Sequence, residues 1–336
     1  MKKIKLTICI PTFNRFRNLD NLLNSIVKNE ISNKLIEVIV SDNASKDKTE
    51  TIVRKYQNKL QIKYIKNTYN LGMAKNIINC TKSASGEFIW ILGDDDLLFN
   101  NSIREIINVI NKNSNCDFFL FNSLNIPKNK SLKYLKSNSL INLENFSKFS
   151  KIKFNKKDYL KNNINYNDTS DFLGAIFTTI FRNKIWQEGI KVFNNNKLIE
   201  KKKFFSLEST FPHTIIFALK FLDKRSFFST LVVSMNINNL RDWLEYYPVI
   251  RSIRINQIID LYRKQGLNFS NFFKSKNSNL KYIIPDLARI YLFKSTRKGY
   301  ISIYRDIIKN LMFPNFYLSP IHYILKKIYY DKKQNN

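Results

Sequence analysis

The chain has 336 residues, 44% of them hydrophobic, with 56 Lys and Arg against 26 Asp and Glu, a formal net charge of +30. This length suffices for one large α/β domain with a smaller appended region, and the hydrophobic content excludes a globally disordered chain. The three cysteines, Cys9, Cys80 and Cys116, have no metal-ligand spacing, which favours a reduced, cytoplasmic location. The apolar run that begins the chain is too short for a signal peptide, and no run approaches the length of a membrane span.

Five short apolar runs predict strands, at 6–10, 35–40, 62–65, 88–92 and 117–122. Apolar residues at helical spacing predict helices between them and before the last run, through 19–27, 52–56, 77–80 and 102–110. Ser45 is the expected N-cap of the second helix. Strands that alternate with helices over short connections predict βαβ units. The expected fold class is therefore α/β, a mostly parallel sheet with helices on both faces.

Polar clusters follow four of these strands. They are Pro11–Arg15, Asp42–Ser45, Asn70–Gly72 and Asp94–Asp96. In a parallel sheet the carboxyl ends of the strands share one edge, and ligands bind at that edge. The sequence therefore predicts a single site built from all four clusters.

The last cluster consists of three consecutive carboxylates, Asp94, Asp95 and Asp96, at the end of a buried strand. Three like charges repel one another unless a positive group lies among them. A divalent cation meets this need, because carboxylate oxygens suit Mg²⁺ or Mn²⁺, and such ions often keep substrate phosphates as further ligands. The alternative is an acidic surface turn that caps the next helix.

Signatures of other nucleotide-binding folds are absent from the sequence. It contains no G-x-G-x-x-G after the first strand and no G-x-x-x-x-G-K-[ST], which argues against dinucleotide redox chemistry and P-loop hydrolysis. Asp42, which follows the second strand, can accept hydrogen bonds from a base or a ribose. The alternative for Asp42 is an Asx-turn or a helix cap.

Four segments, ICIPTFNR, SDNASKDKT, NLGMAKN and GEFIWILGDDD, resemble in order and spacing the family 2 glycosyltransferases with the GT-A fold. The resemblance covers residues 4–122 and fades beyond them. It implies an inverting transfer of a sugar from a nucleotide-sugar donor, with Asp42 reading the pyrimidine or ribose. The residues that it implies to frame the base are Pro11, Thr12, Asn14 and Arg15. Those that it implies to lie near the nucleotide are Asn70, Gly72 and Lys75.

The acidic cluster departs from the D-x-D metal motif usual in this family. Gly93 stands where the first Asp is expected, and Asp95 matches the metal-binding acid. The resemblance thus implies Mn²⁺ or Mg²⁺ held by Asp95 and Asp96, with Asp94 taking over the ribose contact of the missing Asp. The Gly-Asp-Asp-Asp variant resembles a branch that includes abequosyltransferase-like enzymes of surface-polysaccharide synthesis.

The second half carries weaker signals. Residues 126–166 are rich in Lys, Asn and Ser and predict a long, partly flexible excursion on the acceptor side. An apolar, β-rich stretch follows at 171–181, and a helix is expected from Pro212. Inversion needs a base for the acceptor hydroxyl, and Glu208 and His213 beside this helix start are the candidates. The alternatives are a solvated loop acid and a partly buried histidine at a helix terminus.

The C-terminal region combines helical spacing with a strong basic excess. Helices are expected at 243–262, 280–293, 301–312 and 321–330. Residues 240–336 carry 18 Lys and Arg against 6 Asp and Glu, interleaved with aromatic residues. One interpretation is a helical region that lies on an anionic membrane surface, and the other is a region packed on the catalytic domain. The expected division is a nucleotide-sugar half at 1–125, an acceptor half at 126–238 and this region at 239–336.

Taken together, these features predict a metal-dependent inverting glycosyltransferase of surface-polysaccharide synthesis. Its expected partners are a nucleotide-sugar donor and a glycan or polyprenyl-pyrophosphate-linked acceptor. Its expected location is cytoplasmic or peripheral on the inner face of the cell membrane. Two alternatives stay open: a sugar-phosphate nucleotidyltransferase, and a basic nucleic-acid-binding protein, for which three clustered acids would have no use.

Overall fold

A computed structural model describes residues 4–29, 35–127, 147–148, 152–164, 174–193, 202–238, 244–294 and 299–334. The chain forms two compact units whose segments interleave along the sequence. Unit 1 comprises residues 1–163, 175–199 and 219–241. Unit 2 comprises residues 164–174, 200–218 and 242–336.

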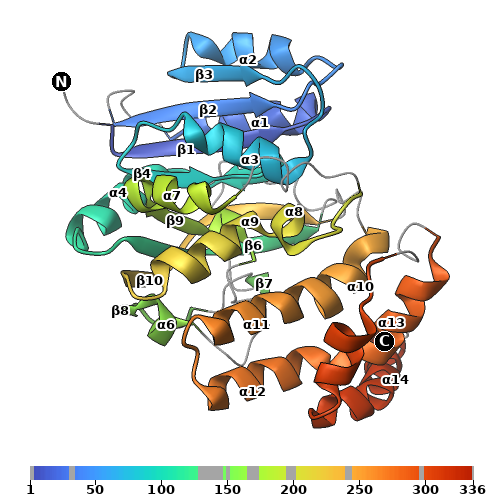
Figure 1. The fold of residues 1–336 in the computed structure, drawn as a ribbon. Helices are drawn as coiled ribbons and strands as arrows, with labels where there is room; N and C mark the ends of the chain where they lie inside the picture. Colours follow the sequence, from blue (N-terminus) through green and yellow to red (C-terminus); the bar gives the residue numbers. More distant parts are fainter. Residues whose placement is uncertain are drawn as a thin grey trace. The chain divides into compact units, whose positions relative to one another are not determined.

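A single mixed sheet forms the centre of unit 1 (Figure 1), with the strand order β3-β2-β1-β4-β9-β6-β10-β5. The strands of its first half are β1 (Leu6–Thr12), β2 (Ile36–Asp42), β3 (Ile62–Lys66) and β4 (Phe88–Ile91). Those of its second half are β5 (Asp96–Leu98), β6 (Phe118–Pro127), β9 (Thr179–Arg182) and β10 (Arg225–Asn238). Two short strands pair outside this order, β7 (Ser147–Lys148) with β6 and β8 (Lys156–Tyr159) with β10. The first half is wholly parallel, whereas β9 and β5 enter the sheet antiparallel.

Helices cover both faces of this sheet. One face carries α1 (Phe16–Val27), α2 (Thr49–Gln57) and α4 (Ser102–Lys112), whose apolar side chains join the main core. The other carries α3 (Met73–Lys82) and α7 (Asn183–Gly189), joined by a 2.8 Å hydrogen bond from Gln187 Nε2 to the Thr81 carbonyl. Short helical turns complete unit 1 at α6 (Leu160–Asn163), η3 (Ile176–Thr178) and η4 (Ile190–Val192).

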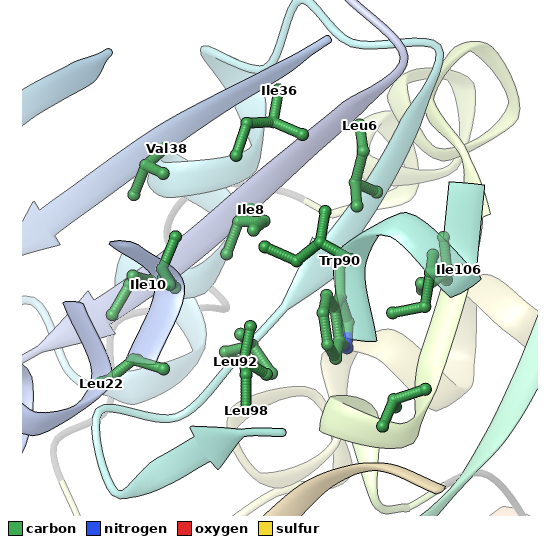
Figure 2. Close-up of a cluster of buried hydrophobic side chains, with 14 of the residues drawn as sticks. Leu6, Ile8, Ile10, Leu22, Ile36, Val38, Trp90, Leu92, Leu98 and Ile106 are labelled. Atoms are coloured by element: carbon green, nitrogen blue, oxygen red, sulfur yellow. The ribbon is translucent and has the colours of Figure 1, made fainter. Parts of the chain in front are cut away.

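The main core follows from the period of two along the strands. Alternate residues of a strand point to the same face, so Leu6, Ile8 and Ile10 all face α1 and α4. Figure 2 shows these side chains with Ile36, Val38, Leu22, Trp90, Leu92, Leu98 and Ile106. Burial of each such side chain contributes about 1.5–3 kcal/mol to folding. This packing fixes the strands whose ends carry the polar clusters.

Unit 2 is helical. Its elements up to residue 264 are α8 (Leu207–Thr210), α9 (Pro212–Ile216), η7 (Leu244–Tyr246), α10 (Tyr247–Val249), η8 (Ile250–Arg254) and α11 (Ile255–Lys264). A π-helical turn, η6 (Phe217–Phe221), continues α9 along the chain, and its residues from 219 on belong to unit 1. The later elements are α12 (Phe269–Asn279), η9 (Leu280–Tyr282), α13 (Ile283–Leu292), η10 (Ile303–Ile307), η11 (Ile308–Asn310) and α14 (Pro314–Gln334).

These elements confirm the expected fold class and the alternating strands and helices of the first 122 residues. Pro212 begins a helix as expected, and α12 is a helix that the sequence analysis did not predict. Part of the excursion at 126–166 and of the stretch at 171–181 lies outside the described residues. None of the helices in the described part of the chain combines the length and the apolar content that a bilayer crossing requires.

The expected cap at Ser45 is wrong. The second helix begins at Thr49, after Lys48. The Ser45 hydroxyl instead accepts a 2.8 Å hydrogen bond from the Asn14 backbone N–H, because the turn after β2 packs against the turn after β1. Ser45 therefore ties two loops together and does not start a helix.

Candidate active site

The three acids of the Gly-Asp-Asp-Asp segment differ in exposure. They lie between β4 and β5, and Asp96 is already the first residue of β5. Asp94 and Asp96 are buried, at 6% and 1% exposure, whereas the side chain of Asp95 keeps 18% exposure. Asp95 is thus the member of the cluster that faces solvent most.

The turn after β1 supplies a hydroxyl and a cation to these acids. Thr12 Oγ1 donates a hydrogen bond to Asp94 Oδ2 at 2.8 Å. Arg15 Nη1 lies 3.3 Å from Asp94 Oδ1 and 3.8 Å from Asp95 Oδ2. The positive group that the sequence analysis required among the carboxylates is therefore present in the chain itself, and two of the four predicted clusters meet here.

Asp96 is engaged inside the protein. Its Oδ2 accepts a 2.7 Å hydrogen bond from the Gly93 backbone N–H, and its Oδ1 accepts one of 2.9 Å from Asn236 Nδ2 on β10. These bonds close the loop from Gly93 to Asp96 and attach it to a strand 140 residues later in the chain. The role of Asp96 as a second metal ligand stays a prediction.

Burial alters the protonation of this loop. Burial raises the pKa of Asp94 to about 6; the Asp95 charge acts in the same direction, while Arg15 and Thr12 oppose it. Burial, followed by the charge of Asp95, also raises the pKa of Asp96 well above its usual range. Both shifts arise because desolvation penalises the charged form of a carboxyl group.

Gly93 leaves room for the acids. A Cβ atom added at this position would lie 2.7 Å from Asp95 Oδ1 and 3.2 Å from Asp96 Oδ2. Contacts this short force a neighbour to move. A side chain at position 93 would therefore displace the Asp95 carboxylate from its present position, which offers a steric explanation for the departure from D-x-D.

The turns after β1 and β2 are joined by Asn14. Its backbone N–H donates to Ser45, as described above, and its Oδ1 accepts a 2.8 Å hydrogen bond from the Lys46 N–H. Asn14 and Ala44 have positive φ, 53° and 66°. This conformation suits Asn and is uncommon for Ala. Pro11 lies beside Ser41 in the β1–β2 ladder, on the way into the first of these turns.

Asp42 is fully buried, and both carboxylate oxygens have partners. Oδ1 accepts from the Ser45 N–H at 2.8 Å, and Oδ2 accepts from the Tyr64 hydroxyl at 2.6 Å. Burial, followed by the bond to Asp42, raises the pKa of Tyr64. Both carboxylate oxygens are therefore engaged within unit 1, and the Asp42 side chain is not exposed to solvent. The donor-reading role of Asp42 stays a prediction.

A network of amides shapes the loop at Asn70–Gly72. Asn43 Nδ2 donates to Asn70 Oδ1 at 2.7 Å, and Asn43 Oδ1 accepts from the Leu71 N–H at 2.8 Å. Gly72 has φ 82° and ψ 162°, a combination essentially restricted to glycine. It is followed by the first turn of α3, where Lys75 is half-buried. The clusters after β2 and β3 therefore meet through Asn43.

The two candidate bases belong to unit 2. Glu208 is half-buried in the first turn of α8. Its charge favours protonation of Arg254, although burial dominates and lowers the pKa of that guanidinium to about 10. His213, in α9, is 3% exposed, with Nε2 3.2 Å from the Gly174 carbonyl oxygen. Both catalytic assignments stay predictions.

The carboxylate oxygens of this site suit a metal ion that also binds phosphate. Within the described ranges, no three His, Cys, Asp or Glu side chains converge in a geometry for holding a metal ion. Mg²⁺ and Mn²⁺ in phosphate-binding sites commonly take one or two carboxylates and complete their coordination with phosphate and water. Asp95, whose side chain is 18% exposed and which is preceded by Asp94, fits that pattern as a hard oxygen ligand.

Comparison with known proteins identifies the family. The model of the family described as "Glycosyl transferase family 2" matches residues 7–185, from β1 to α7. The chain belongs to glycosyl transferase family 2. This match includes every polar cluster of unit 1 that the sequence analysis selected and confirms the predicted family.

Individual relatives match shorter segments of the chain. The abequosyltransferase RfbV of Salmonella typhimurium is 41% identical over 100 residues, 29% of this chain and 30% of RfbV. A Campylobacter jejuni enzyme named GalNAc(5)-diNAcBac-PP-undecaprenol beta-1,3-glucosyltransferase is 34% identical over 169 residues, 47% of this chain and 53% of that enzyme. The chain thus spans about a third to a half of the length of these two relatives.

Solved structures support the fold. Staphylococcus aureus TarS, residues 1–349, has a TM-score of 0.57 at 19% identity, over 88% of this chain and 74% of that one. The mannosyltransferase PcManGT of Pyrobaculum calidifontis, in complex with GDP-Man and Mn²⁺, has a TM-score of 0.54 at 13% identity, over 92% and 88%. At these identities the likeness establishes the architecture, which is that of GT-A-like proteins.

Some residues that organise the candidate site were not foreseen. Asn236 and Tyr64 lie outside the motifs and contact the site only through the folded sheet. Phe13, within the first motif, is 40% exposed beside Thr12. An exposed aromatic residue in a loop beside candidate nucleotide ligands is a signal that could have found it, since bases stack on such rings.

Proposed function

We propose that this chain is a metal-dependent inverting glycosyltransferase that moves a sugar from a nucleotide-sugar donor to an acceptor in surface-polysaccharide synthesis. The observation that carries the proposal is the convergence of Thr12 and Arg15 on Asp94 and Asp95 at the end of β4. A cation, a hydroxyl and a partly exposed carboxylate at one sheet edge form a site that suits a diphosphate and its metal ion.

The donor is assigned to unit 1, in residues 1–125. Phe13 offers a ring for the base, and Asp42 offers a carboxylate to the base or ribose once Tyr64 moves. Asn14, Asn70, Gly72 and Lys75 border the same edge. TarS has been solved with UDP-GlcNAc and PcManGT with GDP-Man, which supports a nucleotide-sugar donor for this chain without naming its base or sugar.

The metal is assigned to Asp95, with Asp94 beside it for the ribose or the ion. When bound, Mn²⁺ or Mg²⁺ supplies Lewis-acid stabilisation of the departing diphosphate. Arg15 adds a second positive charge close to the same oxygens. Thr12 and Arg15 hold the Asp94 carboxylate in position, and Asp96 holds the loop through Gly93 and Asn236.

The acceptor hydroxyl requires a base, for which Glu208 and His213 are the candidates. The base would take the hydroxyl proton as the acceptor oxygen bonds to the anomeric carbon and the bond from that carbon to the diphosphate breaks. The acceptor is proposed to be a glycan or a lipid-linked pyrophosphate. The name of the Campylobacter relative, which includes an undecaprenol-linked acceptor, supports this choice.

A product assay tests the proposal against its rivals. Full-length protein is incubated with Mn²⁺ and a panel of nucleotide sugars, and released nucleoside diphosphate and pyrophosphate are measured separately. Release of nucleoside diphosphate with sugar transfer supports the proposal. Release of pyrophosphate from a nucleoside triphosphate and a sugar phosphate would replace it with a nucleotidyltransferase. Tight, steeply salt-dependent nucleic-acid binding without either product would favour a nucleic-acid-binding protein.

A thermal-shift panel provides a readout independent of turnover. Ligands that bind only the folded state raise the unfolding temperature. UDP, GDP, CDP and TDP are compared with and without Mn²⁺. We expect one base to give the largest shift and Mn²⁺ to increase it.

A further inference from the structure

Among the described side chains of helix α14, those that pack against unit 2 lie on one face. Phe316 is 7% exposed and joins the hydrophobic cluster of this unit. Ser319 is fully buried, and its Oγ accepts a 3.2 Å hydrogen bond from the Ile284 N–H. Further along, the Tyr323 hydroxyl accepts a 2.6 Å hydrogen bond from Arg289 Nη2. These three residues define the inner face of the helix, beside α13 (Figure 1).

The opposite face of α14 is apolar and exposed. Its exposed members are Tyr317 (59%), Leu318 (44%), Ile321 (53%), Ile324 (55%), Leu325 (59%) and Ile328 (47%). Their spacing of three or four residues places them on one side of a helix with 3.6 residues per turn. They form a stripe of more than about 100°, directed away from Phe316, Ser319 and Tyr323. We call these six residues the α14 stripe.

More apolar side chains are exposed in the segments next to α14. Leu311 and Met312, immediately before the helix, are 41% and 58% exposed, and Leu292 at the end of α13 is 70% exposed. The two hydrogen bonds between α13 and α14 join residues in ascending order on both helices, so the helices run in the same direction. Leu292 therefore lies toward the same end of the pair as Ile328. Single exposed apolar residues are ordinary, but a series of this length marks an interaction surface.

Lysines accompany the stripe. Lys326 and Lys327 are exposed in the last described turns, and helical geometry puts one on each flank of the stripe. Lys326 Nζ lies 4.6 Å from the centre of the Tyr282 ring, so its stem crosses the surface of the unit. Both lysines belong to the region 240–336, in which 18 Lys and Arg stand against 6 Asp and Glu.

We propose that the α14 stripe is a docking surface for an anionic lipid membrane, on which the helix lies parallel to the plane of the bilayer. Bulky aliphatic residues on one face, with lysines at its edges, are the features by which interfacial helices bind anionic lipid. The aliphatic side chains would enter the acyl boundary, and the lysine stems would extend to the head groups.

Charge decides between a membrane and a second copy of the chain. Pairing two α14 stripes would bring two strongly basic regions face to face, within a protein whose net charge is already +30. Like charges at such a distance oppose association. An anionic lipid surface presents the opposite charge and covers the same apolar area. The inference is independent of the reaction proposed above, because it rests only on the surface of unit 2.

The test is sedimentation of full-length protein with two kinds of vesicle, phosphatidylcholine alone and phosphatidylcholine mixed with phosphatidylglycerol, at low and high salt. Three variants are compared with the wild type. I321S/I324S interrupts the stripe, and K326Q/K327Q removes its flanking charges. F154S is the matched control, because Phe154 is 71% exposed in unit 1.

The wild type and F154S are expected to bind the anionic vesicles at low salt and to bind them more weakly at high salt. I321S/I324S should lose at least about tenfold in partitioning at both salt concentrations. K326Q/K327Q should lower partitioning into anionic vesicles about fivefold per lysine at low salt and change it little at high salt. Unfolding temperatures confirm that each variant is folded; should I321S/I324S unfold, I328S replaces it.

Three results would overturn the proposal. The first is wild-type protein that does not sediment with anionic vesicles, and the second is a folded stripe variant that sediments like the wild type. The third is a concentration-dependent dimer in analytical ultracentrifugation that I321S/I324S abolishes, without vesicle binding, which would assign the stripe to a second copy of the chain.

Discussion

Thr12 Oγ1 donates a 2.8 Å hydrogen bond to Asp94 Oδ2, joining the turn after β1 to the end of β4 across 82 residues of sequence. This bond, together with Arg15, makes the first and last motifs of the family 2 segment parts of one structure. It also holds a carboxylate that is buried and otherwise costly to charge.

Replacement of Thr12 distinguishes the contribution of its hydroxyl group from that of the side-chain volume. Thr12→Val keeps the volume and removes the donor, leaving Asp94 with one hydrogen bond fewer in a buried position. We expect a loss of about 1–3 kcal/mol in the free energy of unfolding and a fall in transfer rate. Thr12→Ser is the control and should retain most of both. If Thr12→Val matches the wild type in denaturant unfolding and in rate, the hydroxyl has no role in holding Asp94.

Gly72 and Ala44 give opposite predictions at positive φ. Gly72→Ala places a Cβ in a backbone conformation that only glycine adopts readily. The free energy of unfolding should therefore fall by about 1–3 kcal/mol. Ala44→Gly removes a Cβ from a left-handed conformation, and its stability should be unchanged or higher. Urea unfolding of both variants measures this. Equal losses in the two would show that backbone conformation is not the reason for glycine at position 72.

Gly93→Ala tests the spacing of the acids. The added methyl group would meet Asp95 Oδ1 and Asp96 Oδ2, so the Asp95 side chain must move. We expect weaker Mn²⁺-dependent binding of nucleoside diphosphate, measured by calorimetry, with a small change in unfolding temperature. Gly174→Ala is a control at a glycine whose added Cβ would meet only ordinary contacts, with Phe211 at 3.6 Å. Unaltered binding in Gly93→Ala would refute the steric explanation of the missing first Asp.

The sequence predicted the strands and helices of unit 1 because their core residues repeat with clear periods, as at Leu6, Ile8 and Ile10. It missed the antiparallel strand β5, because a strand of three residues is too short to show an alternating apolar pattern. It also missed α12, whose Asn, Ser and Lys residues give a weak apolar pattern.

Within the candidate site, residues next to the motif acids could be predicted and their distant partners could not. Thr12 and Asp94 stand in motifs, whereas Asn236 and Tyr64 reach the site through strand pairing that a single sequence does not display. The interleaving of the two units is likewise a product of tertiary packing, and no change in composition marks it.

Asp42 has two separable roles, which a pair of variants distinguishes. If it reads the donor, Asp42→Ala should weaken nucleoside diphosphate binding by about 1–3 kcal/mol with or without metal. Tyr64→Phe keeps the carboxylate and removes its covering hydroxyl, so binding should be retained or improved. A loss of stability in Asp42→Ala without any change in binding would restrict Asp42 to holding the turn through Ser45.

The central claim is that Asp95 binds the metal ion that accompanies the nucleotide, and Asp95→Asn tests it most directly. The control is Asp223→Asn, at an acid whose side chain is 79% exposed in the same unit. Nucleoside diphosphate binding is measured by calorimetry with and without Mn²⁺, and sugar transfer by released nucleoside diphosphate. We predict that Asp95→Asn keeps its unfolding temperature, loses the Mn²⁺-dependent part of binding and loses transfer, while Asp223→Asn behaves like the wild type. Wild-type transfer and Mn²⁺ response in Asp95→Asn would contradict the account.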